Sequence, residues 1–285
     1  MFIYMNGEII RKDEAVISPF DHGYLYGMGL FETFRVYDGH PFLLDDHLER
    51  LNISLKVLNM KVSYSREEIL EALRQLLAIN NLTDAYIRLN VSAGVGEIGL
   101  QPDPYLQPNL IIFAMPLPPS MNRQEKSAVI LNLNRNTPEG LERLKSHHYL
   151  NNILAKREIA GMPDCEGVFL TKEKYLAEGI VSNLFWVKGK VLYTPAIETG
   201  ILNGITRQFI MKLAHGNEVT VEEGFYRVEE AKRADEIFIT NSIQEIVPIS
   251  FFDGCRMPGM NGNFVKDLQK QYKELSNFLW SRNER

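Results

Sequence analysis

The segment 85–93, AYIRLNVSA, alternates strictly between apolar and polar residues. The apolar positions are Ala85, Ile87, Leu89, Val91 and Ala93, and the polar positions are Tyr86, Arg88, Asn90 and Ser92. Successive side chains of a strand point to opposite faces of its sheet. The pattern therefore predicts a strand with one face in the core and one polar face.

Turn signals before this segment predict an antiparallel start to the chain. Asn6-Gly7 separates FIYM from EII, and Asp38-Gly39 separates LFETFRVY from HPFLL. Both dipeptides tolerate the positive φ values that two-residue hairpin turns require, so each pair of apolar stretches is predicted to form a hairpin.

Two amphipathic helices are predicted between the second hairpin and residue 85. Asp45 or Asp46 is expected to cap the first helix, whose leucines recur at helical spacing: Leu48, Leu51, Leu55 and Leu58. Ser65 and Glu68 form a capping-box pattern ahead of the second, which carries Ile69, Leu73, Leu76 and Leu77.

A boundary between two domains is predicted near residue 120. The strand candidate NLIIFAMPL is followed by LPPSMNRQE, where Pro118 and Pro119 interrupt regular structure. We therefore expect a smaller N-terminal α/β domain at 1–119, a linker at 120–125 and a larger C-terminal domain at 126–285.

The second part is predicted to mix strands and helices, which makes the fold class α+β. Its expected strands are AVILNLN, EGVFLT, NLFWV, KVLYT and EIFIT, with turns at Lys188-Gly189 and Asp253-Gly254. Helices are expected up to about residue 160, from 206 to a stop at Gly216, and at the C-terminus, where Phe264, Leu268, Leu275 and Leu279 are spaced as on one face.

The composition favours a small-molecule ligand. The 285 residues are 45% hydrophobic and 24% charged, with a net charge of −5 and no basic run, so neither nucleic acid nor an anionic membrane is an expected partner. The start lacks a signal-peptide pattern and no apolar stretch approaches bilayer length, so we expect a cytoplasmic protein. The two cysteines are expected to be reduced thiols.

Lys145 is the first candidate for chemistry, in the segment LKSHHYLNNIL ahead of an apolar helix. It could be a surface charge, an accessory to a metal site or a nucleophile. A metal site is not expected, because the adjacent His147 and His148 diverge on a helix or strand and so cannot share one ion.

Three other features are candidates for binding a phosphate. GILNGITRQF has the form of a helix start introduced by glycine, where unpaired N–H groups and the helix dipole attract anions, although an ordinary capped helix gives the same pattern. Arg50 offers a planar fork for a phosphate, or is a solvated helix charge. The polar TNS at 240–242 follows the strand EIFI, and loops at strand ends often bind ligands.

The ordered set LKSHHYLNNILAKREI, AEGIVSNLFW and ILNGITRQF resembles the fold-type IV pyridoxal-phosphate enzymes of the class IV aminotransferase family. These comprise branched-chain aminotransferases, D-amino acid aminotransferases and aminodeoxychorismate lyases. The resemblance runs from MNGEII through DHGYLYGMGLFETFRVYDG to EIFITNSIQEIVPI. It implies the two-domain architecture of D-amino acid aminotransferases, pyridoxal 5′-phosphate in the interdomain cleft, and a homodimer.

The resemblance also implies a role for each matching residue. Lys145 becomes the Schiff-base lysine, Glu178 the carboxylate facing the pyridine nitrogen, and Tyr149 the phenol near the ring oxygen of the cofactor. The phosphate would be held by Arg50, Ile205, Thr206 and Ser242.

Substrate-side residues favour the lyases within this family. Branched-chain aminotransferases usually have glycine where this chain has Thr33, whereas lyases have threonine, and NLFWVKGKVLYTP also resembles the lyases. D-amino acid aminotransferases carry a carboxylate-binding arginine, and enterobacterial-type lyases a basic residue, where this chain has Ala93. Carboxylate recognition is therefore expected from elsewhere, with Arg88 as the candidate.

The function this resemblance implies is conversion of 4-amino-4-deoxychorismate to 4-aminobenzoate and pyruvate for folate synthesis. Lys145 would move the proton at carbon, and Lys145 or Thr33 would protonate the departing fragment. The alternative is an aminotransferase for branched-chain or D-amino acids, and the Tyr86-Ile87-Arg88 pattern is one that branched-chain aminotransferases share. A non-enzymatic protein that binds a phosphate ligand is a third reading.

Overall fold

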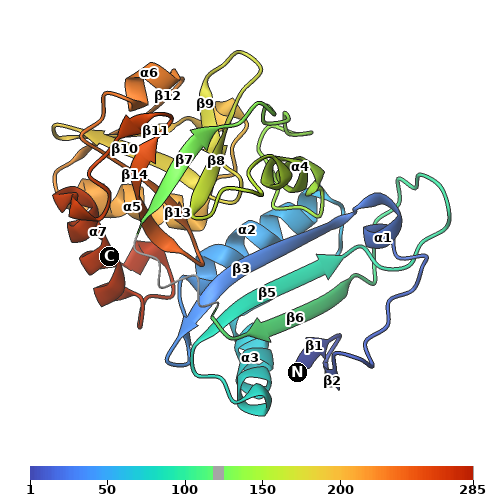
Figure 1. The fold of residues 1–285 in the computed structure, drawn as a ribbon. Coiled ribbons are helices and arrows are strands. Elements are labelled where there is room, and N and C mark those ends of the chain that lie inside the picture. Colours follow the sequence, from blue (N-terminus) through green and yellow to red (C-terminus); the bar gives the residue numbers. More distant parts are fainter. Residues whose placement is uncertain (118–124, 285) are drawn as a thin grey trace. The chain divides into compact units, whose positions relative to one another are not determined.

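The structure is a computed structural model that describes residues 1–117 and 125–284. It divides into two compact units (Figure 1). The first comprises Met1–Pro118, Leu144–His148 and Ser276–Arg285, and the second comprises Pro119–Arg143 and Tyr149–Leu275. Of the linker predicted at 120–125, all but Glu125 lies outside the described residues. Two segments that come after the predicted boundary in the sequence, Leu144–His148 and Ser276–Arg285, thus belong to the first unit.

The first unit contains a six-stranded sheet in the order β2-β1-β6-β5-β3-β4, in which all neighbours are antiparallel. The strands are β1 (Phe2–Met5), β2 (Glu8–Arg11), β3 (Gly29–Tyr37), β4 (His40–Pro41), β5 (Ala85–Ser92) and β6 (Asn109–Met115). Both predicted hairpins, β1–β2 and β3–β4, are confirmed. The alternation in 85–93 is confirmed as well, because every apolar residue of β5 is buried and every polar one is half-buried.

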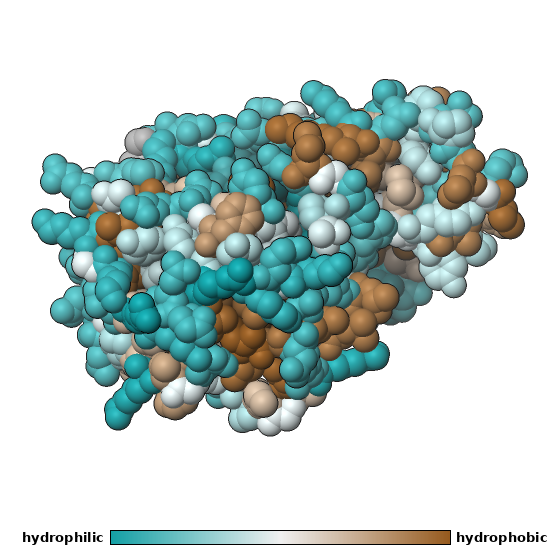
Figure 2. Space-filling model, turned by 90° about the horizontal axis from the view of Figure 1, so that it is seen from above, coloured by the Kyte–Doolittle hydropathy of each residue, from teal (hydrophilic) through white to brown (hydrophobic). Residues whose placement is uncertain are grey.

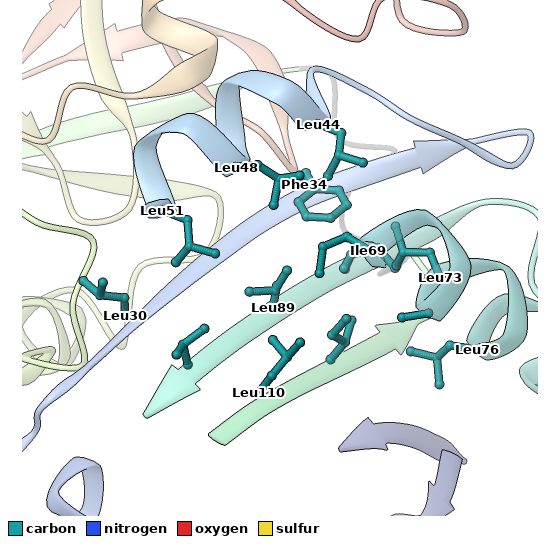
Figure 3. Close-up of a cluster of buried hydrophobic side chains, with 14 of the residues drawn as sticks. Leu30, Phe34, Leu44, Leu48, Leu51, Ile69, Leu73, Leu76, Leu89 and Leu110 are labelled. Atoms are coloured by element: carbon teal, nitrogen blue, oxygen red, sulfur yellow. The ribbon is translucent and has the colours of Figure 1, made fainter. Parts of the chain in front are cut away.

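Two helices cover one face of this sheet, α2 (Leu44–Val57) and α3 (Arg66–Asn80). Figure 3 shows Leu44, Leu48 and Leu51 of α2 meeting Phe34 and Leu89 of the sheet in the buried cluster. Leucines at a helical period supply one apolar stripe, and the strand alternation supplies the surface that it buries. A short helix, α1 (His22–Tyr26), precedes β3.

One predicted helix cap is confirmed and one is wrong. Ser65 accepts a hydrogen bond from the backbone of Glu68, whose side chain accepts one from the Ser65 backbone, as the capping box requires. The N-cap of α2 is Leu43 in the left-handed region, with no side-chain cap. Asp45 and Asp46, expected as caps, lie in the first turn, where their charge still complements the helix dipole.

The second unit contains a nine-stranded sheet in the order β12-β11-β10-β13-β14-β7-β8-β9, with β15 beside β14. Its strands are β7 (Lys126–Ile130), β8 (Cys165–Leu170), β9 (Leu176–Gly179), β10 (Asn183–Lys188), β11 (Val191–Pro195), β12 (Thr220–Gly224), β13 (Glu236–Asn241), β14 (Glu245–Phe252) and β15 (Cys255–Arg256). The helices are α4 (Leu150–Glu158), α5 (Ile205–Gly216), α6 (Val228–Ala231) and α7 (Asn263–Leu275). The fold is α+β, as predicted.

The C-terminal helix is shorter than the sequence pattern predicted. Helix α7 ends at Leu275, and its buried residues are Val265, Leu268 and Tyr272. Leu279 lies beyond the helix, where its carbonyl accepts a hydrogen bond from the backbone of Leu43 in the first unit. In the part of the chain that is described, no helix is long and apolar enough to cross a membrane.

Candidate functional site

Lys145 lies beside the start of β3. The Phe31 N–H donates to the Lys145 carbonyl over 2.9 Å, and the His147 N–H donates to the Gly29 carbonyl over 3.0 Å. An antiparallel bridge joins Leu30 to Ser146. Residues directly opposite in such a pairing project to the same face, so the side chains of Lys145 and Phe31 share one face of the sheet. The Lys145 amine is 4.4 Å from the centre of the Phe31 ring.

The same face carries the two predicted substrate residues. Thr33 lies directly opposite Arg88 in the β3–β5 register. The Arg88 guanidinium carbon is 3.8 Å from the centre of the Phe31 ring, and its Nε donates to Asn90 over 3.2 Å. This face is the one that α2 and α3 do not cover, since Leu30 and Phe34 belong to the opposite, core face. The structure thus brings Lys145, Thr33 and Arg88 together.

Ala93 faces the other way. It is 2% exposed and belongs to the hydrophobic core of the first unit. Recognition of a substrate carboxylate by another residue stays a prediction.

His147 occupies space that a glycine provides. A Cβ built on Gly29 would lie 2.2 Å from the imidazole of His147, so only glycine permits this contact. Burial lowers the pKa of His147, and the charge of Arg88 lowers it further. Its buried Nε2 has no hydrogen-bond partner among the described residues. The imidazole of His147 is thus uncharged at neutral pH, and it lies in the same segment of the chain as Lys145.

Arg50 points from α2 to a buried carboxylate on β3. Its Nε donates to Glu32 Oε1 over 2.8 Å, and its Nη2 donates to Oε2 over 2.6 Å. His47 Nδ1 lies 2.7 Å from the same Oε2. Burial alone would raise the pKa of Glu32, but Arg50 and His47 outweigh it and hold the pKa at about 2. Burial lowers the pKa of His47, so a neutral ring donates Nδ1–H to Glu32.

This network predicts a pH dependence of stability. The pKa of Glu32 falls from 4.5 to about 2 on folding, so its contribution is present above about pH 4.5 and is lost as the pH falls toward 2. The contribution is on the order of 3 kcal/mol. Urea unfolding at pH 5.5 and pH 2.5 should show a larger loss of unfolding free energy for the wild type than for Glu32→Gln. Equal losses in the two proteins would contradict the assignment.

Glu178 is the last residue but one of β9 in the second unit, and its carboxylate is buried among hydrogen-bond donors. Its Oε1 accepts from Arg135 Nε over 2.8 Å, and its Oε2 accepts from the Leu202 N–H over 3.0 Å. Arg143 Nε lies 3.9 Å from Oε1. Burial lowers the pKa of Arg143 to about 10, with a further decrease from Arg135 that Glu178 partly offsets. Two guanidinium groups therefore balance the Glu178 charge.

The predicted phosphate site lies at the start of α5. Gly204 is its N-cap, and no side chain caps the helix, so its first N–H groups have no capping partner. A Cβ on Gly204 would lie 2.2 Å from Asn183 Oδ1, which explains the glycine. The hydroxyls of Thr206 and Ser242 are 3.3 Å apart. Glycine is also a common N-cap residue, so the phosphate site stays a prediction beside the alternative of an ordinary capped helix.

Asn183 connects this helix start to Glu178. Its amide donates to the Leu202 carbonyl over 2.9 Å and lies 3.5 Å from Glu178 Oε2. Tyr149 is the half-buried N-cap of α4, and its carbonyl accepts from the Ile153 N–H over 3.0 Å. The second unit therefore places the Glu178 carboxylate next to the start of α5.

Each unit holds donor groups that suit one part of pyridoxal phosphate. In the first unit a lysine amine can hold the aldehyde carbon. In the second unit a buried carboxylate suits a pyridinium nitrogen, and amides without a side-chain cap suit a phosphate. The sequence reasoning missed Glu32, His47, Arg135 and Arg143. The sequence carried no local signal for the last two, because Arg135 and Arg143 lie far from Glu178 along the chain. No group of three or more potential metal ligands occurs within residues 1–117 and 125–284.

The model of the amino-transferase class IV family matches residues 29–251. The chain belongs to this family. Residues 29–251 include every predicted site residue, from Thr33 to Ser242.

Individual members of the class IV family are similar over nearly the whole chain. An aminodeoxychorismate lyase of Bacillus subtilis is 46% identical over 280 residues, which cover 97% of this chain and 96% of the relative. A solved branched-chain amino acid aminotransferase from Escherichia coli is 33% identical, with a TM-score of 0.86 and coverage of 96% of this chain and 94% of that one.

A third class IV member supports the cofactor prediction. It is the T.th. branched-chain amino acid aminotransferase complexed with N-(5′-phosphopyridoxyl)-L-glutamate, which is 28% identical with a TM-score of 0.85 and covers 97% of this chain and 94% of that one. Family membership and this structure agree with pyridoxal 5′-phosphate as the cofactor.

Proposed function

We propose that this class IV enzyme is a pyridoxal-phosphate-dependent 4-amino-4-deoxychorismate lyase, which forms 4-aminobenzoate and pyruvate for folate biosynthesis. The observation that carries the proposal is the 46% identity to the Bacillus subtilis lyase over 97% of the chain, against 33% to the Escherichia coli aminotransferase. Thr33, the residue type typical of the lyases, supports it from the face that also bears Lys145.

The cofactor residues are those that the family resemblance implies. Lys145 would anchor pyridoxal phosphate covalently, Glu178 would pair with its pyridine nitrogen and Tyr149 would interact with its ring oxygen. Arg50, the amides of Ile205 and Thr206, and the hydroxyl of Ser242 hold the phosphate. When bound, the cofactor supplies an electron sink that acidifies the C–H beside the substrate nitrogen.

The protein's own groups then move the protons. Lys145, released as a neutral amine, removes the proton from the ring carbon. The bond from the ring to the enolpyruvyl oxygen breaks, and Lys145 or Thr33, directly or through water, protonates the departing fragment, which becomes pyruvate. Arg88 binds a substrate carboxylate, for which a planar guanidinium is well suited. Formation of the aromatic ring of 4-aminobenzoate drives the reaction.

An aminotransferase acting on branched-chain or D-amino acids is the second candidate. The Tyr86-Ile87-Arg88 pattern and the likeness to the Escherichia coli structure favour its branched-chain form. The experiment that separates the two is a comparison of kcat/KM for 4-amino-4-deoxychorismate with kcat/KM for leucine or D-alanine with 2-oxoglutarate. We expect the first to exceed the second by orders of magnitude. A higher value for either amino acid would overturn the lyase assignment.

Thr33 gives a second prediction about the same site. A hydroxyl that delivers a proton in the lyase step contributes about 10²-fold or more to the rate. Thr33→Val should therefore lower kcat for 4-aminobenzoate formation by about that factor, while Thr33→Ser keeps most of the rate. Full activity in Thr33→Val would assign the proton donor role to Lys145.

We further propose a cytoplasmic homodimer. Apolar side chains are exposed on two segments of the first unit: Val16, Ile17 and Tyr24 on one, and Val95, Ile98 and Leu100 on the other. The segments touch, because the Gly96 N–H donates to the Phe20 carbonyl over 3.1 Å. Hydrophobic patches interrupt the hydrophilic surface in Figure 2, and such patches often mark interfaces. Light scattering should give about 65 kDa, twice the chain mass of 32.7 kDa, and a mass of one chain would contradict the dimer.

A further inference from the structure

We propose that Glu32 and His47 are positioning residues that fix the guanidinium plane of Arg50 and so orient Arg50 for the cofactor phosphate. The inference rests on the proposed role of Arg50 in phosphate binding. Neither Glu32 nor His47 touches the cofactor in this assignment, since both act through Arg50.

The geometry assigns one edge of the guanidinium to the protein. Glu32 accepts from Nε and Nη2, which share one edge of the planar group. Two parallel hydrogen bonds to one carboxylate fix the plane in which the guanidinium group lies. A guanidinium has five N–H donors in a rigid fork, so one group can serve two anions on two edges.

The two supporting side chains are themselves held firmly. The side chains of Glu32 and His47 are each 2% exposed, whereas that of Arg50 is 16% exposed. Water thus competes little for the Glu32 oxygens, while part of the guanidinium still reaches the surface of its unit. His47 donates Nδ1–H to the oxygen that Nη2 also contacts, so the carboxylate cannot turn without losing both donors.

Two effects of Glu32 on an anion oppose each other. Its charge repels a phosphate, whereas its hydrogen bonds orient the group that attracts it. Glu32→Gln changes both effects at once and so cannot separate them. Glu32→Asp keeps the charge but is one methylene shorter, so it cannot reach Nε and Nη2 together, and it tests orientation alone.

The readout is the ratio of two dissociation constants of the apoprotein, for pyridoxal and for pyridoxal 5′-phosphate, measured by absorbance titration. This ratio reports phosphate recognition and cancels effects on the rest of the ring site. Loss of a pre-ordered side chain weakens binding on the order of fivefold. We expect Glu32→Asp and His47→Leu to lower the ratio by about that factor. His47→Asn, whose amide can stand in for Nδ1–H, should restore it.

Asp46 provides a matched control on the same helix. It is 2% exposed and, like Glu32, binds an arginine, which in this case is Arg282. Asp46→Asn should cost stability without changing the ratio. Comparison with this variant separates loss of phosphate recognition from general loosening of α2.

Arg50→Gln distinguishes failure of the inference from failure of the function on which it rests. If Arg50→Gln lowers the ratio but Glu32→Asp and His47→Leu do not, the positioning role is overturned and the phosphate role stands. If Arg50→Gln leaves the ratio unchanged, Arg50 does not bind the phosphate, and the inference falls with that assignment. Should Glu32→Asp fail to fold, the His47 pair decides the question.

Discussion

Lys145→Ala is expected to lose the covalent cofactor and to slow product formation by about 10³-fold or more. The change removes both the only proposed anchor and the proposed base, and a positioned base alone contributes about 10²- to 10⁴-fold. Lys145 is half-buried and its amine contacts the face of Phe31 rather than the core cluster, so the fold should persist without it. The measurement is the visible absorbance band of the purified protein, followed by the rate of 4-aminobenzoate formation.

Lys126→Ala is the matched control for this change. Lys126 is also half-buried, on β7, and lies 3.6 Å from Glu166. Its variant should keep the absorbance band and the activity. A Lys145→Ala protein that still carried covalent cofactor, or turned over at the wild-type rate, would refute the assignment of Lys145.

Glu178→Ala should both inactivate and destabilise the protein. Arg135 is 9% exposed and would be left with its guanidinium buried beside Arg143 and without the carboxylate. Breaking a buried ion pair in this way costs about 3–5 kcal/mol. Loss of the carboxylate facing the pyridine nitrogen also weakens the electron sink. Urea unfolding of the apoprotein and kcat of the loaded enzyme measure the two effects separately.

Glu178→Gln and Glu166→Ala refine this test. The glutamine keeps the size and one acceptor, so it should lose activity with a smaller loss of stability. Glu166 is another buried carboxylate of the second unit, bonded to Ser182, and its alanine variant should lose stability while activity per folded molecule is retained. If Glu178→Ala and Glu166→Ala reduced activity equally, Glu178 would have only a structural role.

Local signals in the sequence predicted much of the fold. The Asn6-Gly7 turn, the capping box at Ser65 and the alternation along β5 each depend on residues within one element, and each is confirmed. The N-cap of α2 was missed because the side chain of Leu43 makes no hydrogen bond to the helix. Leucine is also not a residue type that marks a left-handed backbone position in a sequence.

Strands that break the usual patterns were also missed. Strand β12 carries Glu222 and Glu223 on a largely exposed edge, so it lacks apolar alternation. Strand β14 contains Pro248, which argues against an inner strand because proline donates no ladder hydrogen bond. These segments form strands because neighbouring strands pair with them. A single sequence does not reveal which strands will be the neighbours.

The candidate site was predicted by resemblance more than by local pattern. The residues matched to the family supplied Lys145, Glu178 and the phosphate cradle. The residues that bind these side chains were not predicted. Arg135 and Glu178 are 43 positions apart in the sequence, and Glu32 lies on a different element from Arg50. Such contacts are set by tertiary packing, which no spacing along one chain encodes.

The central claim is lyase chemistry, and product stoichiometry tests it most directly. The purified protein would be given chorismate, glutamine and an aminodeoxychorismate synthase, with no keto acid added, and 4-aminobenzoate and pyruvate would be counted together. We predict equal amounts of the two products from the wild type and neither from Lys145→Ala. Wild-type protein that carries its cofactor but yields no 4-aminobenzoate under these conditions would contradict the claim.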